Sequence, residues 1–138
     1  MLISVQEIPK VAVEEMNEIH STEVDMVNKL YEKISEWEND KSKEQEVLTI
    51  FEEFLKDVVD HFLFEESMMR ESNFFAYPMH KSEHDRVLFE LKSIEKTIKE
   101  KKDFKMLKEY LLYNFKPWLI SHVKTMDTVT AMYLSNFF

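Results

Sequence analysis

The stretch "HFLFEESMMRESNFFAYPMHKSEHDRVL", residues 61–88, places a short turn between two segments whose apolar residues recur at helical spacing. It also contains three of the five histidines in the chain. Residues four apart on an α-helix share one face, so His61 points the same way as Glu65, and His80 the same way as His84. This stretch therefore predicts a helical hairpin whose imidazole and carboxylate groups point at least partly inward.

The helical spacing of apolar residues continues on both sides of this hairpin. It predicts four helices with a loop at residues 72–78, and these helices cover residues 11–37, 42–71, 79–101 and 103–135. Ser42 and Gln45 form a predicted capping box at the start of the second helix, and Asp103 is expected to cap the fourth. Pro117 lies inside the fourth helix, where we expect it to cause a kink.

The composition favours helices over strands. The chain contains no glycine and only three prolines, so it lacks the residues that tight turns between strands require. Long helices with short connections predict an all-α protein, specifically an antiparallel up-down-up-down four-helix bundle. The length of 138 residues fits a single domain over residues 1–138.

Charge and residue usage exclude several classes of function. A formal net charge of -9 argues against nucleic acid as a partner, because such proteins gain affinity from clustered lysine and arginine. The absence of glycine excludes a phosphate-binding glycine loop, and the absence of cysteine excludes disulfides and thiolate metal sites. No apolar run is long enough to span a membrane, so no membrane partner is expected and the expected location is cytoplasmic.

Every predicted helix carries at least one histidine, and the five are His20, His61, His80, His84 and His122. Helical bundles build metal sites in their core from inward-facing histidines and carboxylates. Imidazole and carboxylate ligands suit iron, manganese or zinc and contain too much nitrogen for calcium or magnesium. Five imidazoles and two carboxylates exceed the needs of one ion, but they suit two ions that share both carboxylates and a solvent-derived oxygen. One coordination position then stays vacant for a small molecule.

The order and spacing of these residues resemble the hemerythrin family over about residues 17–127. The matching pattern is His20, His61-Phe62-x-x-Glu65-Glu66, His80-x-x-x-His84 and Trp118-Leu119-x-x-His122-x-x-x-x-Asp127. The resemblance implies a non-haem di-iron centre with two iron ions per chain, bridged by Glu65, Asp127 and an oxo or hydroxo group.

The same resemblance assigns the remaining ligands and the oxygen pocket. One iron would be bound by His80, His84 and His122, and the other by His20 and His61. Dioxygen would bind reversibly at the iron that has two histidines. The apolar pocket for oxygen would be formed by Phe62, Trp118, Leu119 and Val123. Glu66 is not counted as a ligand, and Thr130 is expected to widen the pocket.

The ligand assignment requires an irregular fourth helix. His122 and Asp127 are five residues apart, which on a regular α-helix separates them by roughly 140°. A π-bulge adds one residue to a turn and would bring Asp127 to the same side as His122. The glutamate-rich faces of the helices are expected to be solvated surface.

The predicted function is reversible dioxygen binding for storage, delivery or sensing, with no catalytic residue assigned. The alternative is a di-iron oxidase, or an enzyme that reacts with peroxide or nitric oxide, on the same bundle. The sequence places no evident general acid beside the oxygen pocket, which favours a binding protein over an enzyme. A third hypothesis is an interaction bundle without metal. The aromatic segment "YLSNFF", residues 133–138, either caps the bundle or joins a subunit interface.

Overall fold

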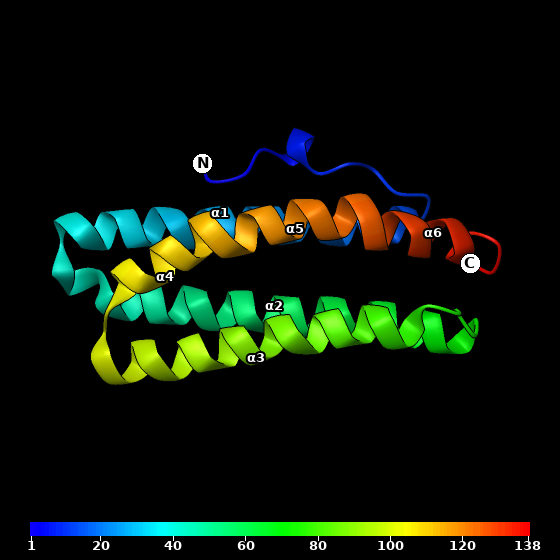
Figure 1. The fold of residues 1–138 in the computed structure, drawn as a ribbon. Helices are drawn as coiled ribbons and strands as arrows, with labels where there is room; N and C mark the ends of the chain where they lie inside the picture. The colour runs from blue at the N-terminus through cyan, green and yellow to red at the C-terminus, as the bar shows by residue number, and fades with distance from the viewer.

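Three long helices and one interrupted helix form an antiparallel bundle in the computed structural model, which describes residues 1–138 (Figure 1). The long helices are α1 (Glu14–Asn39), α2 (Glu44–Glu71) and α3 (Tyr77–Lys101). The fourth consists of α4 (Phe104–Tyr110), α5 (Lys116–His122) and α6 (Thr128–Leu134), which follow one another along one line (Figure 1). There is no strand. The predicted all-α class and the four-helix bundle are confirmed.

One helix start is capped as the sequence predicts, and two others differ from the prediction. Asp103 caps α4 as predicted, since its carboxylate accepts the backbone N–H groups of Lys105 and Met106. The prediction of a capping box at Ser42 is wrong. Asp40 caps a short 3₁₀ turn at Lys41–Lys43 and accepts the N–H of Ser42, because an ionised carboxylate is a stronger acceptor than a hydroxyl.

The turn between α2 and α3 is shorter than predicted. Helix α3 begins at Tyr77 instead of residue 79, because Pro78 occupies the first turn, where its missing N–H is not needed. Asn73 adopts a left-handed backbone with φ of 54°, and Lys102 does so after α3 with φ of 55°. In a chain without glycine, these two residues take the backbone conformation that commonly ends a helix.

The fourth helix contains two π-helical turns. The first, Leu111–Phe115, lies directly before Pro117, and there Lys116 donates its N–H to the carbonyl of Leu111, five residues back. Pro117 itself has no N–H to donate, so the irregularity that it was expected to cause takes the form of a wider turn. The second π turn is Val123–Asp127. The π-bulge that the ligand assignment requires is therefore present.

An N-terminal arm precedes α1 and runs along the outside of the bundle (Figure 1). Asn28 of α1 fixes it near its start. The Asn28 side chain accepts the N–H groups of Leu2 and Ile3 at 2.8 Å each and donates to the carbonyl of Ile3 at 2.8 Å. In the same way, the Asn17 side chain accepts the N–H of Val11 and donates to the carbonyl of Val11. Two amide side chains thus hold an extended segment that has no strand to pair with.

The C-terminal segment, residues 133–138, was expected either to cap the bundle or to join a subunit interface. Its first residues cap the bundle, and its last residues stay exposed. Tyr133 donates its hydroxyl hydrogen to the carbonyl of Ser72 at 2.6 Å, and Leu134 is fully buried, so these residues close the end of the bundle beside the α2–α3 turn. The side chains of Phe137 and Phe138 remain more than half exposed. No helix combines the length and the apolar character that crossing a membrane requires.

The interior of the bundle is apolar except for one polar cluster and for Ser72, whose hydroxyl donates to backbone carbonyls of α2. Its largest fully buried side chains include Phe51, Phe54, Phe62, Phe104 and Phe115. The buried polar and charged side chains are His20, Glu23, His61, Glu65, Glu66, Ser72, His80, His84, His122, Asp127 and Thr130. Burying so many ionisable groups costs free energy unless they bind one another or a metal ion. The contacts among them therefore indicate what the bundle holds.

Candidate metal centre

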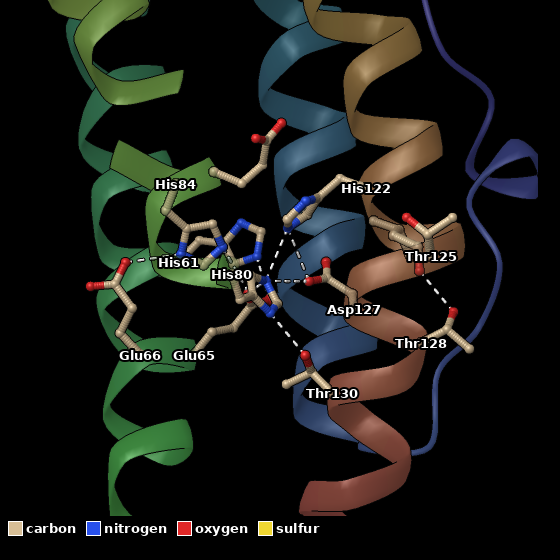
Figure 2. A network of polar contacts seen from close by, with 12 residues as sticks. His61, Glu65, Glu66, His80, His84, His122, Thr125, Asp127, Thr128 and Thr130 are labelled. Carbon is tan, nitrogen blue, oxygen red and sulfur yellow. Dashed lines mark hydrogen bonds and ion pairs between the residues drawn. The ribbon is translucent and has the colours of Figure 1, made fainter. Parts of the chain in front are cut away.

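All five histidines and both predicted bridging carboxylates meet in the interior. Figure 2 labels all of them except His20. Helix α1 supplies His20, α2 supplies His61 and Glu65, α3 supplies His80 and His84, α5 supplies His122, and the second π turn supplies Asp127. None of these side chains is more than 4% exposed. Four segments distant in sequence thus place seven potential ligands in one solvent-excluded volume.

One side of the cluster contains the histidines of α1 and α2. His61 Nε2 lies 2.6 Å from Glu65 Oε2, and His20 Nε2 lies 3.7 Å from the same oxygen. His20 Nε2 is also 2.9 Å from Asp127 Oδ2. His20 Nε2 therefore faces the second oxygen of both carboxylates, and His61 Nε2 faces that of Glu65.

The other side contains the three remaining histidines. His84 Nε2 and His80 Nε2 lie 3.3 and 3.5 Å from Glu65 Oε1. His80 Nε2 and His122 Nε2 lie 3.0 and 3.2 Å from Asp127 Oδ1, and 3.1 Å from each other. These three Nε2 atoms converge on the first oxygen of each carboxylate.

Glu65 and Asp127 therefore divide their oxygens between two groups of histidines. One group of potential ligands is Glu65, His80, His84, His122 and Asp127, and the other is His20, His61, Glu65 and Asp127; within each group the ligand atoms lie within 4.8 Å of one another. Two groups that share both carboxylates provide two neighbouring ion positions with two bridges. The division into three and two histidines is the one that the resemblance implies, and the ligand assignment itself stays a prediction.

Several atoms of the cluster lack the partner that a buried polar atom requires. Glu65 Oε1, Asp127 Oδ1 and His84 Nε2 are buried and have no hydrogen-bond partner. All three point into the larger group of ligands, where a cation would satisfy them together. A donor set of imidazoles and carboxylates, with no sulfur, fits iron, manganese or zinc. The residues present therefore fit a pair of transition-metal ions.

The second π turn explains how Asp127 reaches the cluster. On a regular α-helix it would point away from His122, but the turn at Val123–Asp127 contains one additional residue. The Thr128 hydroxyl donates to the carbonyl of Val123 at 2.7 Å, and the Thr128 N–H also points to it. This polar side chain stabilises the widened turn and, with it, the position of the carboxylate.

Three histidines have a buried partner at their second ring nitrogen. The Nδ1–H of His61 donates to Glu23, Nδ1 of His84 lies 2.9 Å from Glu66 Oε2, and Nδ1 of His80 lies 2.8 Å from Thr130 Oγ1. Figure 2 shows the latter two contacts. A hydrogen bond at Nδ1 leaves Nε2 free for a metal ion and fixes the orientation of the ring.

These partners correct one expectation and bear on another. The glutamate-rich faces are not solvated throughout, because Glu23 is fully buried and Glu66 is 5% exposed. The spacing of Met16, His20, Glu23 and Val27 would have placed Glu23 in the inward stripe of α1. Thr130 contacts Nδ1 of His80 and lines a hollow at the surface to which none of the four predicted pocket residues contributes; its effect on the oxygen pocket stays a prediction.

Attraction between the histidines and the carboxylates sets which groups of the metal-free cluster carry a proton. Burial disfavours the charged form of His20 and His80, yet the adjacent carboxylates of Asp127 and Glu65 raise the pKa of each of these histidines to about 9. Burial also opposes the ionised form of Glu65, but the charge of His61 and hydrogen bonds from the histidines hold the pKa of Glu65 well below its usual range. A cation that binds at the Nε2 atoms must displace these protons.

Two of the four predicted oxygen-pocket residues lie against histidines, and the other two are buried. The ring of Phe62 stacks on His84 at a centroid distance of 3.9 Å and an interplanar angle of 1°. Trp118 stacks on His122 at 4.5 Å, and its Nε1–H donates to Glu83 at 2.9 Å. Leu119 and Val123 are fully buried. Two aromatic rings thus cover two of the histidines with apolar atoms.

A buried cluster of histidines and carboxylates between antiparallel helices defines a metal-binding helical bundle. Residues 11–134 match the domain family described as "Hemerythrin HHE cation binding domain". The chain is also 36% identical over 136 residues to the bacteriohemerythrin of Aquifex aeolicus (strain VF5). The matched region covers 99% of this chain and 100% of that protein.

Solved structures agree with this class. Wild-type hemerythrin superposes with a TM-score of 0.77 at 23% identity and covers 98% of each chain. A hemerythrin variant with a leucine replaced by alanine gives a TM-score of 0.77 at 22% identity, over 98% of this chain and 97% of that one. At such identities the likeness concerns the fold. The chain belongs to the hemerythrin family, and its buried histidine, glutamate and aspartate cluster is a metal site of the kind that binds iron in this family.

Proposed function

We propose that this protein binds dioxygen reversibly at a non-haem di-iron centre. The observation that carries the proposal is the division of the Glu65 and Asp127 oxygens between two groups of histidines. We further propose that a single domain over residues 1–138 holds this centre. The bacteriohemerythrin relative supports the proposal by its name and by its match along the whole chain.

In this proposal each iron has its own histidines. His80, His84 and His122 hold one ion, and His20 and His61 hold the other. Glu65 and Asp127 bridge the two ions together with an oxo or hydroxo group. When bound, the iron pair would supply the electrons and the coordination position that dioxygen requires. The unequal number of histidines leaves that position on the ion held by two.

The protein's own side chains favour reversible binding over substrate oxidation. Phe62, Leu119 and Val123 are fully buried and carry no proton donor, and Trp118 directs its N–H away from the cluster towards Glu83. An apolar surrounding slows the arrival of protons and the escape of charged oxygen species. The hydrogen bonds at the Nδ1 atoms of His61, His80 and His84 hold these rings in place while the ligand binds and leaves.

The test is a spectroscopic cycle on the iron-loaded protein. The protein is reduced without oxygen, exposed to oxygen, and then deoxygenated repeatedly while the visible spectrum is recorded. Charge-transfer bands that appear with oxygen and disappear on its removal are expected. Irreversible conversion to a diferric form contradicts reversible binding and favours an oxidase.

Metal analysis tests the site separately. The wild type is expected to hold two irons per chain. Glu65→Ala should abolish paired iron binding, because it removes the carboxylate that both groups of histidines share. Glu53→Ala, an exposed glutamate of the same helix, is the matched control and should keep both irons. A Glu65→Ala protein with the full iron content would contradict the bridging role.

A further inference from the structure

One end of the bundle exposes apolar side chains that the iron site does not use. They lie where the α2–α3 turn meets α6, and we call them the apolar end patch: Phe75, Met79, Val129, Met132 and Phe137. Their exposures are 77%, 67%, 49%, 63% and 56%. The rings of Phe75 and Phe137 both pack against Tyr133, at centroid distances of 6.5 and 5.1 Å. Phe75, Met79 and Val129 line one hollow, and Met132 follows Val129 by three residues on α6, so it shares that side of the helix. The patch therefore extends across the turn, α6 and the C-terminal segment.

A hollow of about 400 Å³ lies within this patch. Met79, Met126 and Val129 form its walls, and the hydrogen-bonded pair of His80 and Thr130 lies at its inner end. No aspartate, glutamate, lysine or arginine lines it, although a third of the chain is charged. Phe75 stands on the rim, and most of its ring is in solvent. A projecting aromatic ring and an apolar hollow thus lie side by side on one surface.

We propose that the apolar end patch is the interface of a two-fold symmetric dimer of this chain, in which Phe75 of each copy fills the hollow of the other. A two-fold interface joins the same patch on both copies, so the patch must complement itself. A projection next to a hollow of matching chemistry meets this condition. One copy thus offers both halves of the contact, so a second copy can fill the hollow and cover the ring at the same time.

The exposed area is sufficient for a dimer. A standard interface buries about 800 Å² per partner, of which about 450 Å² is apolar. Taking about 200 Å² for a whole phenylalanine, Phe75 and Phe137 together expose roughly 270 Å². Met79, Val129 and Met132, each about half exposed or more, supply the remainder. Isolated apolar residues on a surface are common, but a continuous patch of this size marks an interaction site.

The test measures the mass of the protein in solution by sedimentation, from low to high micromolar concentration. The wild type should form dimers and no larger species. Phe75→Glu and Met132→Glu should each weaken the dimer by on the order of a hundredfold, because a carboxylate would be buried without a partner. Phe89→Glu is the matched control, since Phe89 of α3 is 74% exposed and lies outside the patch. It should leave the dimer intact.

Salt and spectroscopic controls complete the test. Each copy has a net charge of -9, so salt should strengthen an apolar dimer by screening the repulsion between copies. Circular dichroism should be unchanged in all variants, because the replaced side chains are exposed. A wild type that stays monomeric at high concentration, or a Phe75→Glu protein that dimerises like the wild type, overturns the proposal. Assembly beyond two copies overturns it as well.

Discussion

Glu23 of α1 contacts a histidine of the metal cluster through its side-chain carboxylate. It is fully buried, its Oε2 atom accepts the Nδ1–H of His61, and its Oε1 atom has no partner. Such a residue touches neither a metal ion nor dioxygen. It acts through His61, because a negative charge at Nδ1 raises the basicity of Nε2 and fixes the ring.

Replacing Glu23 by alanine should therefore lower iron affinity by about 10- to 100-fold. Glu23→Gln should have a smaller effect, because an amide oxygen still accepts the Nδ1–H. Affinity is measured by competition with a chelator. Glu18→Ala, on the exposed side of the same helix, should match the wild type. Equal affinities for Glu23→Ala and Glu18→Ala would show that the buried contact has no influence on the metal.

The raised pKa values of His20 and His80 predict how the metal-free protein responds to pH. Both rise from an unperturbed value of 6.5 to about 9, so the folded chain binds more protons than the unfolded chain between these pH values. The associated stability is fully present below pH 6.5 and is lost as the pH rises through 9. Each histidine should contribute up to about 3 kcal/mol.

This pH dependence is measured by urea denaturation of the metal-free and iron-loaded proteins across the same pH range. The metal-free protein should lose stability between neutral pH and pH 9 and then level off. The iron-loaded protein should lack this slope, because a metal ion replaces the protons at Nε2. Equal slopes in both forms would mean that these two histidines are not the groups responsible.

At the scale of the element, the π turn at Val123–Asp127 decides whether the bundle contains a second bridging carboxylate. The extra residue rotates the chain that follows it by roughly 100° relative to a regular helix. Asp127 then points inward, and Thr130 and Ala131 are buried after it. A regular helix of the same sequence would direct Asp127 towards solvent.

Deleting Lys124, an exposed residue of this turn, should restore a regular helix and remove Asp127 from the cluster. Iron content should fall below two per chain, while circular dichroism should still show a strongly helical protein. Lys124→Ala keeps the chain length and should keep both irons. Two irons in the deletion variant would contradict the role assigned to the π turn.

The sequence predicted the helices and most of the cluster because these follow regular periodicity; Asp127 is the exception, since it reaches the cluster through a π turn. Apolar spacing located the four helices, and the spacing of His61 with Glu65 and of His80 with His84 located the inward faces. The partners of the histidines could not be predicted in the same way. Glu23 and Glu66 differ from exposed glutamates only in their neighbours across the bundle, and those neighbours are set by packing. Helix starts were misplaced where Asp40 and Pro78 outweighed the more common signals.

At the scale of the whole molecule, the N-terminal arm is attached by side chains of α1. Asn28 makes three hydrogen bonds of 2.8 Å to Leu2 and Ile3, and Asn17 makes two to Val11. The arm also covers an open cavity of about 710 Å³, to which His20 contributes. The arm therefore covers the bundle beside a histidine of the metal cluster.

Replacing Asn28 by alanine should release the start of the arm. The free energy of unfolding should fall by about 1–3 kcal/mol, because three hydrogen bonds are lost together. Trypsin should cut faster after Lys10, which is exposed and lies between the two attachment points. Asn39→Ala, at the exposed end of α1, is the control. An unchanged rate of cleavage would mean that Asn17 and the buried apolar residues hold the arm alone.

The course of the arm also separates the two chain ends. Met1 lies on the flank of the bundle, about midway along α1, while Phe138 lies at the end that the α2–α3 turn closes (Figure 1). A reporter domain fused ahead of Met1 would project sideways and leave both ends of the bundle accessible. The same domain fused after Phe138 would stand beside the apolar end patch and hinder contact between two copies. Labelling and immobilisation of this protein are therefore best directed to its N-terminus.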